Sequence, residues 1–395
     1  MTSEASYPSV KLRPGKGRRL SQGAPWVFSD EIAMDRRTRK LAPGSIAHLV
    51  EGETSHGIAA FNPESRIAAR LLDSDETATI DENWFTERLT RAHALRERLF
   101  DAPYWRLVHA EGDGLPGVVI DRFGEAAVVQ PNAAWADKLV GQIVDALSAV
   151  TGVRTIVVNA TSRVRRLEGL EERLEVVKGQ LEGPIEVPMN GAVYLADLAG
   201  GQKTGLYYDQ RPNHAFVRGL ARDARVLDVF CHVGGFGLAA LAGGAADVTA
   251  VDSSAAALGL ATQGAALIGA TDRYAVQKSD GFSALEALGG ERFDIVICDP
   301  PAFAPSKGAL DAGLRAYQRL ARLAAPLVRS GGILCLCSCS HAAGIEAFHK
   351  ACVTGIGKAG RTGALIHSGR AGPDHPIHIG LPETGYLKAL FFRLD

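Results

Sequence analysis

The chain of 395 residues contains no apolar run long enough to cross a membrane. Runs such as 333–337 fall far short of the roughly 20 residues that a spanning helix needs. Residues 1–7 show none of the apolar stretch of a secretory signal. Six cysteines in a chain of this length do not make a disulfide framework. We therefore expect a soluble, cytoplasmic protein with reduced thiols and no membrane partner.

Neither sign of charge is in excess over the whole chain, since 43 Lys and Arg residues nearly balance 44 Asp and Glu residues and the net charge is only −1. Any binding to nucleic acid must therefore depend on a local patch. The first forty residues supply one, because they contain nine Lys and Arg residues and only four Asp and Glu residues. The cations are Lys11, Arg13, Lys16, Arg18, Arg19, Arg36, Arg37, Arg39 and Lys40. Such clusters attract phosphate, although charge alone also allows a solvated basic face.

The chain has neither internal repeats nor low-complexity segments, and its length suggests two or three domains. Residues 9 to about 75 read as short strands, such as 45–50 and 67–72, broken by frequent Gly and Pro. Residues 76–190 mix helices at about 82–100 and 135–149 with strand-like pieces at 106–108, 117–121, 126–130 and 155–159, which indicates a small α+β domain.

From residue 191 to 395 the pattern changes to strands that are apolar throughout, alternating with helices rich in small residues. The strands are expected at 225–229, 247–251, 274–277, 294–298 and 332–337. Strands of this kind are buried on both faces of a mostly parallel sheet. We therefore predict an α/β, doubly wound, Rossmann-like domain whose ligands bind at the carboxyl ends of the strands.

The first of these strands carries Asp228, and the chain continues through Phe230, Gly234 and Gly235 into a helix. Glycine lets the backbone approach a ligand closely. The turn does not have the G-x-G-x-x-G spacing of an NAD site, so an NAD oxidoreductase is disfavoured. The carboxylate of Asp228 suits the cationic amino acid part of S-adenosylmethionine.

Acids also end the next two units of the pattern, at Asp252 and Asp280. Asp252 can accept both ribose hydroxyls of a bound nucleoside. Asp280 can meet an adenine amino group, with Phe282 packed on the ring. Ordinary helix capping is the alternative for these acids. Three acids in successive units nevertheless favour an S-adenosylmethionine site.

The fourth strand ends in Asp299, which Pro300 and Pro301 follow directly. Two prolines exclude both strand and helix and give a rigid loop. With Phe303 and Lys307, this loop is predicted to bind the substrate by stacking a flat base and to fix Asp299 beside the cofactor.

On the fifth strand Cys335, Cys337 and Cys339 share one face. Neither C-x-x-C spacing nor a fourth ligand accompanies them, so we expect no metal. Cys339 differs because it lies at the carboxyl end of the strand, where its thiolate can attack carbon 6 of a pyrimidine. Such an attack activates carbon 5 of cytosine, which is otherwise a poor nucleophile towards a methyl group. Asp299 would hydrogen-bond the nitrogen edge of the ring.

Two chemical roles stay open at this point. His341 and the cationic sulfonium are possible sources of thiolate stabilisation at Cys339. Asp209, His341 and Glu383 are candidates for the base that removes the carbon 5 proton, and none is preferred.

These motifs resemble the RlmI-like family of bacterial large-subunit ribosomal RNA methyltransferases, which make 5-methylcytosine. The matching segments are 205–211, 228–230 with 234–236, 299–303 with 306–307, 338–340, 374–376, 385–388, 17–20 and 25–29. One departure is Cys231-His232-Val233, where relatives usually carry a triplet like Ser-Tyr-Thr.

The resemblance implies a PUA RNA-binding domain over 1–75, a central domain over 76–190 and a methyltransferase domain over 191–395, assembled as a homodimer. It also implies that Cys339 is the nucleophile and Asp299 its partner, and that Tyr208 and Asp209 contribute to the cofactor site. It makes the basic N-terminus, with Arg18 and Arg19, a surface for large-subunit ribosomal RNA.

Two other functions compete with cytosine methylation. A related domain that methylates guanine N7 shares the Asp-Pro-Pro-x-Phe-x-x-Ser-Lys loop but has no Ser-Cys-Ser nucleophile, so Cys339 favours cytosine. A noncatalytic RNA-binding factor for ribosome assembly is the second alternative. The intact set of Asp228, Asp252, Asp299 and Cys339 argues against that alternative.

Overall fold

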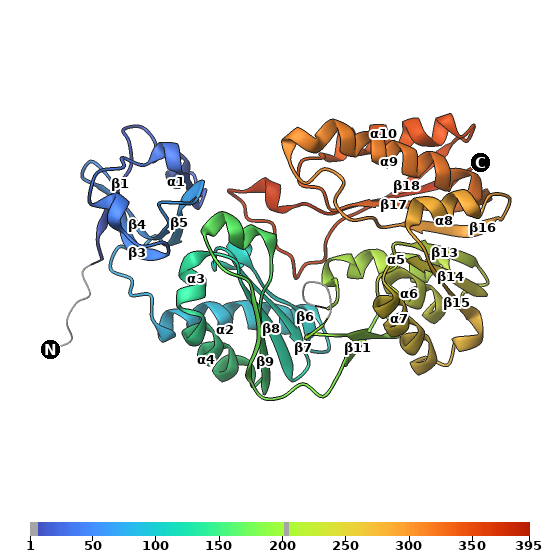
Figure 1. Cartoon of the computed structure of the whole chain (residues 1–395), viewed down its shortest axis with the longest axis horizontal. Coiled ribbons are helices and arrows are strands. Elements are labelled where there is room, and N and C mark those ends of the chain that lie inside the picture. The colour runs from blue at the N-terminus through green and yellow to red at the C-terminus, as the bar shows by residue number, and fades with distance from the viewer. Residues whose placement is uncertain (1–6, 201–204) are drawn as a thin grey trace. The chain divides into compact units, whose positions relative to one another are not determined.

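The computed structural model describes residues 7–200 and 205–395. It divides the chain into two compact units (Figure 1). Unit 1 comprises Met1–Glu182 and Pro373–Thr384, and unit 2 comprises Gly183–Gly372 and Gly385–Asp395. Residues 1–6, which include Glu4 and most of the N-terminal segment considered above for a secretory signal, lie outside the described residues.

The first sheet of unit 1 has five strands in the order β1-β3-β4-β5-β2. Its elements are β1 (Ser9–Lys11), the short helix α1 (Arg18–Ser21), β2 (Trp26–Phe28), β3 (Ser45–Glu51), β4 (Thr54–Phe61) and β5 (Ile67–Asp73). Val10, Leu49 and Phe61 belong to its hydrophobic core. The β-rich module and its strands at 45–50 and 67–72 are confirmed.

The second sheet of unit 1 has the order β10-β9-β8-β7-β6. Its strands are β6 (Tyr104–His109), β7 (Val118–Phe123), β8 (Ala126–Pro131), β9 (Thr155–Ala160) and β10 (Arg173–Lys178), and its helices are α2 (Glu82–Leu99), α3 (Ala134–Lys138) and α4 (Val140–Thr151). Asp81 caps α2 by accepting the Trp84 N–H at 3.0 Å. The helix expected over 135–149 is instead two helices, because Leu139 between them leaves the helical conformation.

Residues 373–384 join unit 1 through a buried charged group. Arg96, which is fully buried, donates to both carboxylate oxygens of Asp113 at 2.5 and 2.7 Å and to the carbonyl of Asp374 at 2.9 Å. The Asp374 carboxylate accepts the backbone N–H of Arg106 at 3.1 Å and lies 2.9 Å from Nδ1 of His375. Because buried charges need partners, these bonds explain why segment 374–376 belongs to unit 1.

Unit 2 contains a seven-stranded sheet in the order β15-β14-β13-β16-β17-β19-β18. The first five strands are parallel and comprise β13 (Arg225–Val229), β14 (Asp247–Asp252), β15 (Tyr274–Lys278), β16 (Phe293–Cys298) and β17 (Val328–Ser338). All five expected strands, and with them the Rossmann-like class, are confirmed. Antiparallel β18 (Gly363–Gly369) and β19 (Lys388–Leu394) and the hairpin β11 (Ile185–Met189) and β12 (Ala192–Ala196) were not expected.

Helices cover both faces of this sheet (Figure 1). They are α5 (Arg211–Leu220), α6 (Gly235–Ala242), α7 (Ala255–Leu267), α8 (Gly281–Ala287), α9 (Leu310–Ala324) and α10 (Ile345–Lys358). The helices α8, α9 and α10 pack in one layer, and α5, α6 and α7 pack in the other. The strand order reverses between β13 and β16, and ligands of doubly wound sheets bind at such a switch point.

Among the described residues, no helix is both long and apolar enough to span a membrane. In the same part of the chain, no group of three or more His, Cys, Asp and Glu side chains is placed to hold a metal ion.

Candidate active site

The turn that follows β13 holds an unusual backbone. Phe230 and His232 have φ values of 65° and 50°, and Gly234 follows at 85°. Residues other than glycine rarely adopt this left-handed region, and such conformations concentrate at functional sites. Asp252, at the end of β14, accepts the His232 N–H at 2.9 Å and the Ser254 N–H at 2.8 Å. The second strand-terminal acid thus fixes the turn after the first strand.

Asp228 lies beneath this turn and is fully buried. Its Oδ2 accepts the Gly237 N–H at 2.8 Å, whereas Oδ1 has no hydrogen-bond partner among the described residues. Burial raises the pKa of Asp228 to about 7, and the bond from Gly237 offsets only part of that rise. Asp228 therefore holds the start of α6, and its direct contact with a ligand remains a prediction.

The glycines of the turn are required by packing within unit 2. A Cβ at Gly234 would lie 2.8 Å from the Tyr274 hydroxyl, and one at Gly235 would lie 2.7 Å from Nε2 of His214. The expected reason, close approach to a ligand, is therefore not needed to explain these residues.

Asp280 precedes α8 and is exposed. It caps this helix by accepting the Phe282 N–H at 2.9 Å, and hydrogen bonding from Ser283 lowers the pKa of its carboxyl group. Helix capping thus accounts for Asp280, and its contact with adenine remains a prediction.

Aromatic rings connect the turn after β13 to the proline loop. The Phe230 and Phe282 ring centroids are 6.5 Å apart, those of Phe282 and Phe303 are 5.8 Å apart, and those of Phe303 and Tyr317 are 4.9 Å apart. Phe282 and Phe303, which were predicted to stack on flat ligand rings, therefore belong to one continuous series of aromatic contacts.

Asp299 directly follows β16. Its N–H donates to the Val229 carbonyl at 3.2 Å, and its Oδ2 accepts from Nε2 of Gln210 at 2.9 Å. Gln210 is buried and in turn accepts from Nδ2 of Asn213 at 2.6 Å. Gln210 therefore orients the Asp299 carboxylate. This role was not predicted, although Gln210 lies in motif 205–211.

The proline loop forms neither strand nor helix over 299–306, as predicted. Pro300 is buried, Phe303 is half-buried, and Pro301 and Lys307 are exposed. Two of the residues proposed to bind substrate thus present their side chains to solvent.

Cys339 follows the last residue of β17. β16 and β17 are parallel, with Cys298 opposite Leu336, so Asp299 and Cys339 leave the sheet at the same edge. Cys339 is half-buried, whereas the other five cysteines are buried. Burial raises the pKa of Cys335 and Cys337. Both therefore lie in the core of unit 2.

The two serines beside Cys339 are fully buried and hold its backbone in place. The Ser340 hydroxyl lies 2.8 Å from the Tyr317 hydroxyl and accepts the Ala304 N–H at 3.0 Å. The Ser338 hydroxyl donates to the Tyr317 hydroxyl at 2.9 Å. Through these bonds the segment that carries the thiol is tied to α9 and to the proline loop.

Tyr207 contacts the turn after β13, since its ring centroid lies 5.0 Å from that of His232. Burial raises the pKa of Tyr207, and the charges of Asp209, Asp299, Cys339 and Asp252 raise it further, in that order. Four groups from four segments of unit 2 therefore act on one hydroxyl. The neighbouring Tyr208, which was expected near the cofactor, is fully buried, and the Arg211 guanidinium lies 5.3 Å from its ring centroid.

Tyr386 connects two of the three candidates for the carbon 5 base. Its hydroxyl donates to Oδ2 of Asp209 at 2.6 Å, and its ring centroid lies 5.2 Å from that of His341. Glu383 lies in the 373–384 stretch, which belongs to unit 1.

The residues of this site fit a cationic ligand. The carboxylates of Asp209, Asp252 and Asp299 act on the same hydroxyl, and the buried Oδ1 atoms of Asp209 and Asp228 have no hydrogen-bond partner among the described residues. A sulfonium or ammonium group offsets such negative charge.

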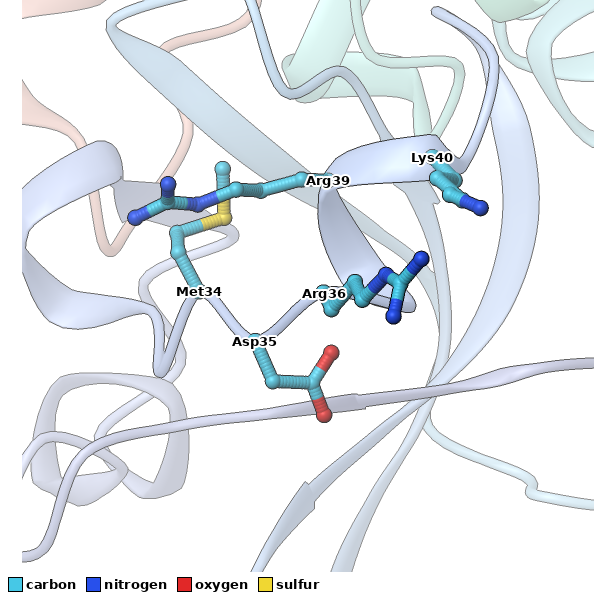
Figure 2. Close-up of a pocket in the computed structure, with 5 residues that line it drawn as sticks. All are labelled: Met34, Asp35, Arg36, Arg39 and Lys40. Atoms are coloured by element: carbon cyan, nitrogen blue, oxygen red, sulfur yellow. The ribbon is translucent and has the colours of Figure 1, made fainter.

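Basic side chains gather on the first domain of unit 1. Arg18 is exposed at the start of α1, and the Arg19 guanidinium lies 5.3 Å from the Phe28 ring centroid. Arg36, Arg39 and Lys40, with Met34 and Asp35, line an open depression of about 460 Å³ on the same domain (Figure 2).

Comparison with known proteins decides the family. Residues 149–362 match the family model of S-adenosylmethionine-dependent methyltransferases, and residues 10–74 match that of PUA-like domains. Ribosomal RNA large subunit methyltransferase I of Cronobacter sakazakii is 36% identical over 390 residues, which cover 96% of this chain and 98% of that protein. The protein of the same name from Tolumonas auensis is also 36% identical, with 98% and 99% covered.

The chain belongs to the ribosomal RNA large subunit methyltransferase I family. It is therefore an S-adenosylmethionine-dependent methyltransferase with an N-terminal PUA-like domain. A solved methyltransferase structure complexed with SAH has the same fold, with a TM-score of 0.84 and 19% identity over 98% of this chain and all of that one. A methyltransferase from Streptococcus mutans gives 0.82 at 18% identity, with the same coverage.

Proposed function

We propose that this methyltransferase modifies carbon 5 of a cytosine in large-subunit ribosomal RNA, through a covalent bond between Cys339 and carbon 6 of the ring. The observation that carries the proposal is the exposure and the position of Cys339. It is the half-buried cysteine of a chain whose other cysteines are buried, and it leaves the sheet beside Asp299. Guanine N7 is already nucleophilic and would have no use for such a thiol.

The chemistry follows from the groups at this edge of the sheet. The Cys339 thiolate forms a bond to carbon 6, and the electron pair of the ring double bond moves so that carbon 5 becomes nucleophilic. S-adenosylmethionine, when bound, supplies a methyl group attached to a positively charged sulfur. Asp299, oriented by Gln210, hydrogen-bonds the nitrogen edge of the ring and stabilises the adduct. A base then removes the carbon 5 proton, the bond between sulfur and carbon 6 breaks, and the thiolate is restored.

We propose two of the three candidates, Asp209 and His341, for that base. Asp209 and His341 both interact with Tyr386 in unit 2, and Oδ1 of Asp209 has no hydrogen-bond partner among the described residues. We keep both as candidates and prefer neither, because we also propose Asp209 as a ligand of the cofactor.

For the cofactor, we propose that Asp228, Asp252 and Asp209 bind the cationic and ribose parts, and that Phe230, Gly234 and Gly235 shape the turn beneath them. Asp280 is proposed for the adenine end, although it caps α8. We assign Tyr207, rather than Tyr208, to the contact between the cofactor site and the thiol, because Tyr207 interacts with groups from both.

For the substrate, we propose that Pro300, Pro301, Phe303 and Lys307 receive the target base and its phosphate. The domain over 1–75, including Arg18 and Arg19, would hold more distant RNA by phosphate contacts. The three-domain division, a homodimer and a cytoplasmic location complete the proposal.

Nucleoside analysis of ribosomal RNA tests the proposed reaction. Large-subunit RNA from cells without this chain is incubated with the purified protein and S-adenosylmethionine, digested, and analysed by mass spectrometry. We expect one 5-methylcytosine per RNA, and none with Cys339→Ala, which should bind the cofactor nearly as tightly as the unmodified protein. Cys352→Ala, at a buried cysteine of α10, is the matched control and should remain active. The appearance of N7-methylguanine, or full activity of Cys339→Ala, would contradict the proposal.

A further inference from the structure

Lys388 has no role in the reaction proposed above. It is the first residue of β19, which pairs with β17 so that Lys388 lies opposite Ser338. The residue is 8% exposed, although lysine almost always keeps its ammonium in water. A buried cation at this place, next to the segment that carries the thiol, needs an explanation.

The hydrogen bonds of Lys388 are directed at the turn that begins with Cys339. Its Nζ donates to the carbonyl of Ser340 at 2.7 Å and to the carbonyl of Ala343 at 2.7 Å. Both acceptors are neutral, so the described hydrogen bonds of the ammonium do not neutralise its charge. Burial lowers the pKa of Lys388 to about 8, and the charge of Cys339 opposes that fall. The charges of Lys388 and Cys339 therefore interact.

Other groups act on Cys339 from the surrounding elements. Tyr207, before α5, and Tyr317, on α9, both interact electrostatically with the thiol. Asp299 interacts with Tyr207 as well and carries a negative charge, which opposes a thiolate nearby. His341 follows two residues after Cys339 and is exposed. Against this background, a cation bonded to the adjacent carbonyl is the group suited to offset a negative sulfur.

From this geometry we propose that Lys388 is a positioning residue for the nucleophile: its ammonium stabilises the thiolate form of Cys339 and holds the 340–343 turn that presents it. This assignment rests on the proposed function for its catalytic meaning, and it identifies a source of thiolate stabilisation besides His341 and the cofactor. The interaction itself is independent of RNA and of S-adenosylmethionine. It can therefore be measured even if the methylated base proves to be something other than cytosine.

The test is the pH dependence of thiol alkylation in the full chain. Iodoacetamide reacts with the thiolate, and the half-buried Cys339 should react before the five buried cysteines. Rates are measured between about pH 6 and pH 10, without RNA or cofactor, and Cys339→Ala gives the background. We expect the alkylation midpoint of Lys388→Met to lie about one pH unit above that of the unmodified protein, with a roughly tenfold lower rate near pH 7.

Three further variants separate charge from structure. Lys388→Arg keeps the cation, so its alkylation midpoint should lie close to that of the unmodified protein. Lys388→Gln keeps a hydrogen-bond donor without the charge and should behave like Lys388→Met. Lys358→Met, at an exposed lysine of α10, should leave the midpoint unchanged. If folded Lys388→Met and Lys388→Gln proteins alkylate with the midpoint of the unmodified protein, the proposal is wrong.

A reciprocal measurement keeps the test decisive if the neutral variants do not fold. The titration of Lys388 is followed by NMR in protein with ¹³C-labelled lysine, in the unmodified chain and in Cys339→Ala. Because the coupling between two charges is mutual, removing the thiolate should lower the Lys388 midpoint by about half a pH unit or more. An unchanged midpoint would overturn the proposal. Loss of methylation with intact coupling would instead count against the proposed function alone.

Discussion

Replacement of Asp228 by Asn should stabilise unit 2 at neutral and alkaline pH while weakening cofactor binding. Asp228 is fully buried, and its Oδ1 has no hydrogen-bond partner among the described residues. Asn keeps the shape of the side chain and an oxygen to accept the Gly237 N–H, but it carries no charge. The substitution therefore isolates the cost of holding a carboxylate beneath the turn after β13.

The magnitude follows from the pKa of Asp228, which is raised from 3.8 to about 7 by burial. Between these values the folded protein keeps a proton that the unfolded chain has lost. Stability therefore falls as pH rises through this window and is constant above it. Each pH unit costs about 1.4 kcal/mol, so the unmodified protein should lose about 2 kcal/mol between about pH 5.5 and pH 7 from this group. Asp228→Asn should not show this loss.

Urea unfolding at about pH 5.5 and pH 8 measures the effect. All four tryptophans, Trp26, Trp84, Trp105 and Trp135, belong to unit 1, so a transition seen by circular dichroism but not by tryptophan fluorescence belongs to unit 2. For that transition, the urea midpoint of the unmodified protein should fall more than that of Asp228→Asn when the pH is raised from about 5.5 to about 8. The difference between the two falls should be at least about 0.7 M.

The matched control for this prediction is Asp272→Asn, at an exposed aspartate of unit 2. Its urea midpoint should follow that of the unmodified protein. Calorimetry should show weaker binding of S-adenosylmethionine to Asp228→Asn. Equal pH dependence of the unmodified and Asp228→Asn proteins would refute the reasoning that Asp228 is held at a raised pKa.

Two other properties should respond to single changes. RNA affinity, measured by filter binding, should fall steeply as the salt concentration rises. Replacing Arg18 and Arg19 by Ala should make the slope of log K against log salt shallower by about 1 to 2. A flat slope in the unmodified protein would contradict a role of the N-terminal patch in RNA binding. Tyr317→Phe keeps the ring but removes the hydroxyl that bonds to Ser338 and Ser340. It should destabilise unit 2 by about 1–3 kcal/mol in urea unfolding and slow methylation. Unchanged stability and rate would show that these bonds do not hold the thiol.

The parallel sheet and the position of its acids were predictable because they depend on local patterns. Strands that are apolar throughout identify the sheet, and the residue after each strand must lie at its carboxyl edge. Asp299 and Cys339 were therefore found without any knowledge of long-range contacts. Asp228 was predicted at the same edge, but its burial beneath α6 depends on how the glycine turn packs.

The remaining features depend on contacts between residues far apart in the sequence. Lys388 bonds to Ser340, which precedes it by 48 positions, and Gln210 bonds to Asp299 across 89 positions. Neither separation leaves a periodic signal. The bond between Arg96 and Asp374 spans 278 positions, and it belongs to the group that makes residues 373–384 part of unit 1. Strand β18 escaped prediction because most of its residues are exposed, unlike those of the buried strands beside it.

The central claim, a covalent bond between Cys339 and the target cytosine, is tested most directly with RNA that contains 5-fluorocytosine. Fluorine at carbon 5 cannot be removed as a proton is, so the adduct should persist after methyl transfer. With S-adenosylmethionine present, the account predicts a protein–RNA species that survives denaturation, with the nucleotide attached to Cys339 by peptide mass spectrometry. The absence of that species from an enzyme that methylates the unsubstituted RNA would contradict the covalent mechanism.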